Sequence, residues 1–166
     1  MKAVLQPVRF SETNERERGE FDRQLERLKE LYGGEAAFLP AVELAQAKAG
    51  EADAFLFPQL VGAAFSHEAA FRAMELPVLV LSSAFGTVEM WDWEIVAWLR
   101  ENAGINVLTP YSGELARVIL RALAVRRGMR KGTRFLMFQD DPGEGMQAYI
   151  FKRFFWWEKE SARQIE

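Results

Sequence analysis

The stretch PVLVLSSAFGTVEMWDWEIVAWLREN, residues 77–102, contains a strand and a helix in succession. Its run of residues 78–81 is apolar without polar alternation, which is typical of a parallel strand that helices cover on both faces. A turn of small residues follows, and Thr87 stands where a helix N-cap is expected. Because ligands bind beyond the carboxyl ends of the strands in open α/β sheets, we expect residues 83–93 on the rim of a site.

The helix expected after Thr87 has one apolar stripe, which is the predicted core face at about 100° per residue. The stripe comprises Val88, Trp91, Ile95, Trp98 and Leu99. Met90 and Trp93 point away from it. Two interpretations of these two side chains stay open. They pack under a neighbouring loop, as large apolar surface residues often do, or they line a pocket or a subunit contact, where Trp is a favoured anchor.

Strands and helices alternate along the rest of the chain. Further strands are expected at residues 2–8, 36–39, 54–57 and 105–108. Helices are expected at residues 12–32, 42–49, 67–75 and around 115–123. In the first of these helices, the apolar residues at helical spacing are Phe21, Leu25, Leu28 and Tyr32. The alternation predicts a Rossmann-like α/β fold, an open and mostly parallel sheet with helices on both faces.

Composition excludes several classes of function. The length of 166 residues suits one domain or one domain with part of another. A formal net charge of −3 argues against nucleic-acid binding. The absence of cysteine excludes disulfides, thiolate metal sites and a cysteine nucleophile. Neither a dinucleotide fingerprint nor a P-loop is present, and the lack of a long apolar run or a signal-peptide pattern predicts a cytoplasmic protein without membrane contact.

A few polar residues are candidates for chemistry. Gln6 and Arg9 lie at the end of the first expected strand, and a solvated loop is the favoured interpretation of each alone. His67 is the only histidine, and at a helix start it is more often a surface residue than a ligand. Asp140, with its acidic neighbours Asp141 and Glu144, offers oxygen ligands that suit Mg²⁺ or Mn²⁺. Pro and Gly between them favour an ordinary turn.

The last part of the chain predicts a strand at residues 134–138 and a helix at residues 146–163. Its apolar residues occupy nearly every side of that helix: Tyr149, Ile150, Phe151, Phe154, Phe155, Trp156 and Trp157. A helix that is apolar all round is normally buried. We therefore expect that this helix inserts into an oligomer or that the protein continues beyond Glu166, and the second alternative is favoured. The predicted organisation is a Rossmann-like N-terminal domain at 1–128 and the start of a second α/β domain at 129–166.

Two stretches, SSAFGTVEMWDWE at 82–94 and FQDDPGEGMQAYIFKRFFWWEKE at 138–160, resemble the L-fucose isomerase and L-arabinose isomerase-like family. The resemblance implies the N-terminal segment of an enzyme that interconverts aldoses and ketoses with a divalent metal, usually Mn²⁺. Its known members are oligomers with sites between subunits. Because the metal ligands of the family come from later parts of the chain, the resemblance implies that this segment binds no metal, supplies no catalytic residue and is inactive alone.

The same resemblance implies which residues contact the substrate. They are Gln6, Arg9, Phe85, Glu89, Trp91 and Trp93. Trp91 or Trp93 offers a flat apolar face to the C–H side of a sugar, and the polar side chains hydrogen-bond its hydroxyls. The expected partners are a sugar substrate, the remainder of a longer chain and further copies of it. Two alternatives stay open, a non-catalytic sugar- or small-ligand-binding α/β module and an assembly domain.

Overall fold

A computed structural model describes residues 1–103, 105–130 and 132 of the chain. All of them belong to the first of two units, Met1–Thr133. The features predicted for the C-terminal part lie outside the described residues. These are the strand at 134–138, the acidic turn with Asp140, Asp141 and Glu144, the aromatic helix and thus nearly all of the second domain predicted at 129–166.

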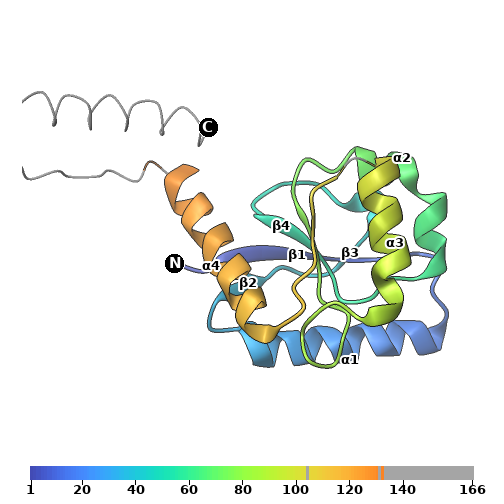
Figure 1. Ribbon diagram of the computed structural model, residues 1–166, viewed down its shortest axis with the longest axis horizontal. Coiled ribbons are helices and arrows are strands. Elements are labelled where there is room, and N and C mark those ends of the chain that lie inside the picture. Colours follow the sequence, from blue (N-terminus) through green and yellow to red (C-terminus); the bar gives the residue numbers. More distant parts are fainter. Residues whose placement is uncertain (104, 131, 133–166) are drawn as a thin grey trace, which may run out of the picture. The chain divides into compact units, whose positions relative to one another are not determined.

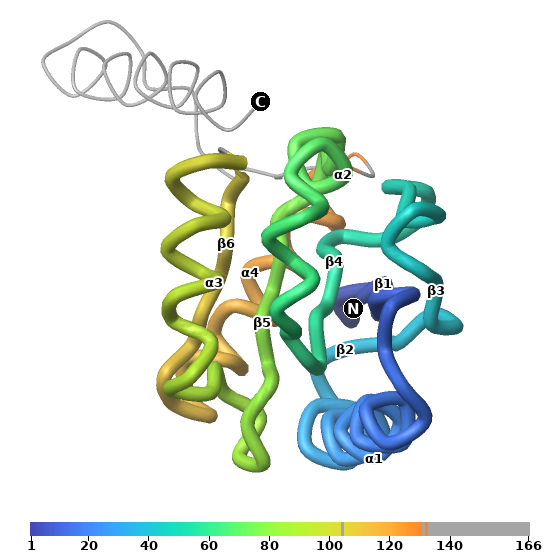
Figure 2. The backbone as a smooth tube through the Cα atoms, turned by 90° about the vertical axis from the view of Figure 1, so that its right-hand side faces the viewer, coloured from blue at the N-terminus to red at the C-terminus, as the bar shows by residue number. Residues whose placement is uncertain are grey.

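A sheet of six strands forms the centre of the unit. The strands are β1 (Ala3–Arg9), β2 (Ala36–Phe38), β3 (Val42–Glu43), β4 (Ala54–Phe57), β5 (Val78–Val80) and β6 (Val107–Leu108). Their order is β2-β1-β4-β5-β6, with β3 paired to the end of β1, and all pairs are parallel. Figure 2 shows β6, β5, β4 and β1 following one another across the view. The order reverses between β1 and β4, which makes this the switch point where ligands bind in doubly wound sheets.

Helices cover both faces of the sheet (Figure 1). The α-helices are α1 (Glu15–Tyr32), α2 (Glu68–Arg72), α3 (Trp93–Trp98) and α4 (Gly113–Arg130). The short turns are η1 (Leu44–Gln46), η2 (Gly62–Ser66), η3 (Met90–Asp92) and the π-helical η4 (Leu99–Ala103). Successive strand residues point to opposite faces. Phe55 and Phe57 therefore pack with α2 and α3, whereas Leu56 packs with α1 and α4. The Rossmann-like α/β fold that the sequence predicts is confirmed.

Helix α1 follows directly from its sequence. Asn14 caps it, because its side chain accepts a hydrogen bond from the Glu17 backbone N–H and the Glu17 carboxylate accepts one from the Asn14 N–H. This capping box explains why the helix begins at Glu15 and not at residue 12. The four apolar residues predicted to face the core, from Phe21 to Tyr32, are buried. Among the described helices, none combines the length and apolar character that crossing a membrane requires.

Two predicted helices are wrong in part. In place of the helix expected at 42–49, residues 42–43 form strand β3 and residues 44–46 form the turn η1, because Val42 and Glu43 pair with the end of β1. The helix expected after Thr87 begins only at Trp93. Thr87 lies instead in a loop, where its side chain and its N–H both contact the Ser83 hydroxyl. Trp91, predicted on the core face, is consequently 78% exposed.

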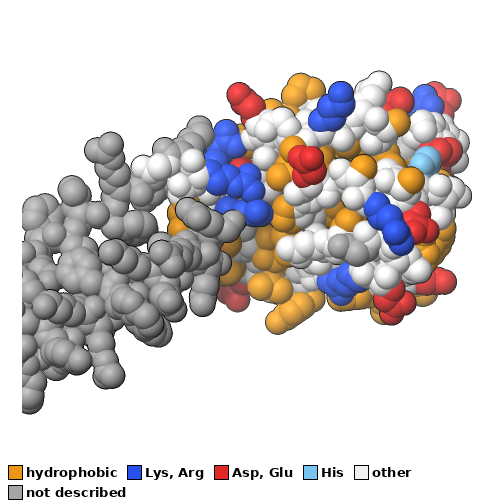
Figure 3. All heavy atoms as spheres, turned by 90° about the horizontal axis from the view of Figure 1, so that it is seen from above, with side chains coloured by type: hydrophobic (Ala, Val, Ile, Leu, Met, Phe, Trp, Pro, Cys, Tyr) orange, Lys and Arg blue, Asp and Glu red, His pale blue; other side chains and the backbone are white. Residues whose placement is uncertain are grey.

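Surface charge is mixed. On the face that Figure 3 shows, basic and acidic side chains are interspersed with apolar atoms. Several of the ion pairs are exposed, among them Arg16 with Glu20 and Lys29 with Glu26 within α1. Such pairs each stabilise the fold by well under about 1 kcal/mol.

Candidate functional site

A cavity of about 390 Å³ opens at the carboxyl ends of β4 and β5. Three segments line it. Glu20 and Gln24 come from α1, Gln59 comes from the loop after β4, and the residues after β5 supply the third wall. The segments that follow β1, β4 and β5 thus meet here, beside the switch point of the sheet. This is the position at which doubly wound sheets bind small molecules.

The third wall is the β5–α3 loop, defined as residues 82–92. Ser82 connects the start of this loop to its end, because its hydroxyl donates a hydrogen bond to Asp92 Oδ2 and accepts one from the Glu89 backbone N–H at 3.0 Å. Ser82, Glu89, Asp92 and Trp91 all line the cavity. The loop therefore presents two carboxyl groups, a hydroxyl and an indole to one space.

Asp92 is a buried carboxyl group in this wall, with 9% of its surface exposed. Burial raises the pKa of Asp92 above its ordinary value of 3.8, the hydrogen bond from Ser82 lowers it, and the nearby Glu89 charge raises it further. A carboxyl group with a raised pKa retains its proton at higher pH than an exposed one. Glu89 is more exposed, so the two carboxyl groups of the cavity differ in environment.

Side chains of helix α1 hold the β5–α3 loop in place. Gln24 Nε2 donates to the carbonyls of Leu81 and Ser83, and Arg27 donates to the carbonyl of Ala84. Tyr32, the last residue of α1, donates its hydroxyl hydrogen to the carbonyl of Gly86 at 2.8 Å. Each of these side chains binds the backbone of the loop. The loop is consequently fixed in place although its tip is exposed.

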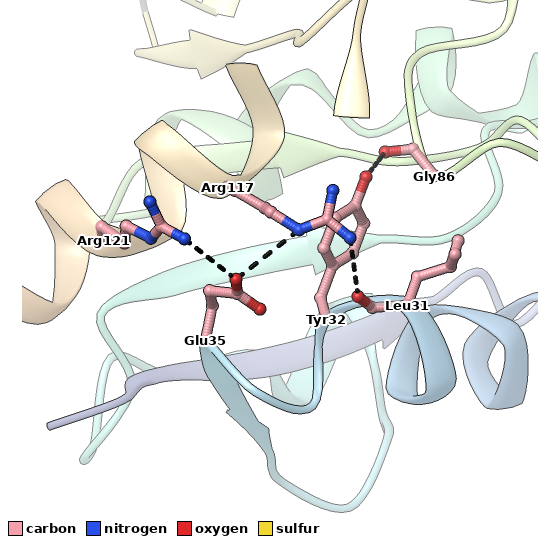
Figure 4. A network of polar contacts seen from close by, with 6 residues as sticks. All are labelled: Leu31, Tyr32, Glu35, Gly86, Arg117 and Arg121. Atoms are coloured by element: carbon pink, nitrogen blue, oxygen red, sulfur yellow. Dashed lines mark hydrogen bonds and ion pairs between the residues drawn. The ribbon is translucent and has the colours of Figure 1, made fainter. Parts of the chain in front are cut away.

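A polar network supports Tyr32 from the other side (Figure 4). The Arg117 guanidinium of α4 lies 5.4 Å from the centre of the Tyr32 ring, a cation–π distance. The Glu35 carboxylate lies 3.5 Å from the Arg117 guanidinium and 3.4 Å from the Arg121 guanidinium. This network links α1, α4 and the loop that forms the cavity wall.

The ionisable side chains that line the cavity are all acidic. Glu20, Glu89 and Asp92 contribute carboxyl groups, and Glu20 is paired at 2.9 Å with Arg16, which does not line the cavity. Among the described residues of the lining, none is Lys, Arg or His. Phosphate groups are normally bound by Arg, Lys or a helix N-terminus. The cavity therefore suits a ligand that donates hydrogen bonds and carries no anionic group.

The structure brings together two of the six residues that the sequence predicts as substrate-binding, Glu89 and Trp91, which line the cavity. Phe85 and Trp93 belong to the same stretch but lie outside the lining, and they are 82% and 42% exposed. Gln6 is buried, and its amide donates to the Pro40 carbonyl at 2.6 Å.

Arg9 also lies apart from the cavity, at the end of β1, where its guanidinium is 3.7 Å from the Glu43 carboxylate. Sequence reasoning did not name Gln24, Gln59 or Asp92 as individual contacts, although Asp92 lies within residues 83–93, which it places on the rim. The position of Asp92 after a central strand was an available signal. Gln24 resembles any other polar residue on the outer side of an amphipathic helix.

His67 lies outside this cavity. Its Nε2 is 2.7 Å from the Glu12 carboxylate, and its ring lies beside Phe10 in a tilted arrangement. The pair joins the loop after β1 to the start of α2. Within residues 1–103, 105–130 and 132, no group of three or more His, Cys, Asp or Glu side chains is placed to hold a metal ion.

The ionisation of Asp92 predicts a pH-dependent stability. A raised pKa in the folded protein means that the folded state binds the proton more tightly, so stability falls as the pH rises through the interval above 3.8. Asp92→Asn cannot ionise and still offers Ser82 an oxygen acceptor. We expect the variant to gain stability relative to the wild type between about pH 3 and about pH 7. Urea denaturation at both pH values measures this difference, and an equal difference at both would contradict the expectation.

No protein-family model and no curated protein matches the sequence. The structural support for a function therefore comes from the cavity and from its position on the sheet.

Proposed function

We propose that this domain binds a sugar in the cavity beyond the carboxyl ends of β4 and β5. The observation that carries the proposal is the pairing of Trp91, an exposed indole, with an acceptor-rich lining that has no cationic side chain among its described residues. A pyranose has an apolar C–H face that stacks on an aromatic ring and hydroxyls that donate to carboxylate and amide oxygens. A volume of about 390 Å³ falls within the range of small-molecule sites.

We further propose that the domain serves a metal-dependent aldose–ketose isomerase as its N-terminal, substrate-positioning segment. The support is the resemblance of residues 82–94 and 138–160 to that family. The described residues do not fit a metal site of their own, because Asp92 is buried against Ser82 and no cluster of ligands surrounds it. The Mn²⁺ of such an enzyme is proposed to lie in another part of it. The domain then contributes binding and orientation rather than proton transfer.

Isothermal titration of the 166-residue chain with L-fucose and with L-arabinose tests the binding proposal. We expect saturable binding of at least one of these sugars and none of its phosphorylated form, because a phosphate would meet carboxylates. Absence of binding to both sugars would overturn the proposal. An assay for aldose-to-ketose conversion with Mn²⁺ added tests the second proposal, which expects no turnover by this chain alone.

Trp91→Ala is expected to weaken sugar binding about tenfold. Stacking removes about 50 Å² of ring surface from water, which contributes about 1.3 kcal/mol at about 25 cal/mol per Å², and this corresponds to a factor of about ten in affinity. Met90→Ala is the matched control, because Met90 is a neighbouring exposed apolar residue outside the lining. The same titration measures both variants. Equal affinity in Trp91→Ala and the wild type would remove Trp91 from the site.

A second candidate is an assembly role. The β5–α3 loop and the loop after β6 expose Phe85, Trp91 and Tyr111, and an apolar surface of this kind is common in subunit contacts. Sedimentation of the chain with and without sugar distinguishes the candidates. Self-association that persists in Trp91→Ala and does not respond to sugar favours assembly, whereas a monomer that binds sugar favours the binding function.

A further inference from the structure

We infer that Gln24 determines the specificity of the cavity by presenting a fixed hydrogen-bond acceptor to one hydroxyl of the ligand. This inference rests on the proposed sugar-binding function and names a residue that the sequence does not single out. Gln24 lies on α1, is half-buried and lines the cavity. No part of the resemblance to sugar isomerases involves it.

The orientation of the Gln24 amide is fixed by its two donor contacts. Nε2 lies 2.9 Å from the carbonyl oxygen of Leu81 and 2.6 Å from that of Ser83. An amide nitrogen carries two hydrogens, so both are used. Rotating the amide by half a turn would place Oε1 against two carbonyl oxygens, which is repulsive, so Oε1 cannot exchange places with the nitrogen.

The oxygen of the same amide remains available. No donor among the described residues hydrogen-bonds to Gln24 Oε1. In the same part of the chain, no fully buried side-chain nitrogen or oxygen lacks a partner, so Oε1 retains access to solvent. Gln24 thus differs from a surface glutamine, whose amide presents either a donor or an acceptor. The polar atom of Gln24 that is left for a ligand is therefore an acceptor only.

Two of the groups beside Gln24 in the lining are already engaged by other protein groups. The Ser82 hydroxyl already donates to Asp92 and accepts from Glu89 N–H. The Glu20 carboxylate is paired with Arg16. A fixed neutral acceptor selects a ligand group that donates, and it disfavours an analogue that lacks this donor because the acceptor is then desolvated without a partner.

Deoxy analogues of the sugar that binds in the titrations with L-fucose and L-arabinose test this inference. For the wild-type chain, we expect that removing one particular hydroxyl weakens binding about fivefold, the factor that corresponds to one hydrogen bond. In Gln24→Met, which has a similar shape without the amide, the parent sugar and that analogue are expected to bind equally. The preferences for the other hydroxyls are expected to persist. An unchanged preference for every hydroxyl in Gln24→Met would overturn the inference.

Arg27→Met is the matched control. Arg27 anchors the same loop from the same helix through the Ala84 carbonyl but does not line the cavity. If Gln24 acts only by holding the loop, Arg27→Met would lose the same hydroxyl preference, and the inference fails. We expect Arg27→Met to retain the wild-type ratio of affinities.

A measurement on the wild-type chain tests the inference without any variant, so its result does not depend on whether the variants fold. In ¹⁵N-resolved NMR, both side-chain amide hydrogens of Gln24 are expected to be protected from exchange without sugar, and the amide resonance is expected to shift with the parent sugar but not with the discriminated analogue. An unprotected amide hydrogen would overturn the fixed orientation. If the wild type binds neither sugar, the proposed function fails and this inference fails with it, whereas binding without a Gln24-dependent preference overturns this inference alone.

Discussion

Asp53→Ala is expected to lower the free energy of unfolding by about 3 kcal/mol, because it leaves a poorly solvated arginine without its charged partner. Asp53 is 4% exposed and its carboxylate is 3.4 Å from the Arg127 guanidinium, whose side chain is 17% exposed. The same carboxylate accepts the Val4 backbone N–H at 2.8 Å, and the Asp53 N–H donates to the Val4 carbonyl at 2.7 Å. One side chain thus joins β1, the start of β4 and the last turns of α4.

Urea denaturation followed by circular dichroism measures this loss. Asp53→Asn keeps an oxygen for the Val4 N–H and loses only the charge, so its effect is expected to lie between those of the wild type and Asp53→Ala. Glu26→Ala is the matched control, because its ion pair with Lys29 is exposed and contributes at most about 0.5 kcal/mol. Equal stability of Asp53→Ala and Glu26→Ala would show that the Asp53–Arg127 contact does not stabilise the fold.

Gly86→Ala is expected to destabilise the protein by about 2 kcal/mol and to weaken sugar binding, since backbone strain of this kind typically amounts to about 1–3 kcal/mol. Gly86 has a φ of +71°, which side chains disfavour. A Cβ atom there would lie 2.7 Å from Tyr32 Cε2 and 2.8 Å from the Tyr32 hydroxyl oxygen. Either the β5–α3 loop or the Tyr32 ring must move, and both changes disturb the wall of the cavity.

Gly34→Ala separates this effect from the general effect of replacing glycine. A Cβ atom at Gly34 would have no other atom within 4 Å, so we expect a change in stability of less than about 0.5 kcal/mol. Thermal denaturation and the sugar titration measure both variants. If Gly86→Ala unfolds and binds sugar as Gly34→Ala does, the close contact between Tyr32 and the loop is not needed for the site.

The sequence predicts well those features that local pattern determines. The apolar stripe of α1 follows from the spacing of Phe21 to Tyr32, and the buried run at β4 follows from its continuous apolar residues. The start of α3 does not follow in this way. Residues 87–92 read as the first turns of a helix, but groups from other parts of the chain bind the backbone there. The Thr87 N–H donates to the Ser83 hydroxyl, the Val88 N–H to the Pro110 carbonyl and the Glu89 N–H to the Ser82 hydroxyl.

The composition of the cavity was predictable to a smaller extent. A position after a central strand indicates residues 83–93 as a group, because the rim of an open sheet can be located from the strand itself. The choice of Glu89 and Trp91 within this group came from the family resemblance. Gln24 enters the lining through the packing of α1 beside β5, which is a tertiary relation. The pairing of residues 42–43 with β1 is likewise tertiary, and it replaces the helix that local preference favours there.

The α1 side chains that hold the β5–α3 loop all donate hydrogen bonds to main-chain carbonyl oxygens. Gln24 binds those of Leu81 and Ser83, Arg27 binds that of Ala84, and Tyr32 binds that of Gly86. Because every residue carries such an oxygen, the residues at positions 84 and 85 can be substituted without loss of these hydrogen bonds. The scaffold therefore offers a segment whose outward chemistry is replaceable, and new ligand preferences can be introduced there by substitution while its path over the sheet is preserved.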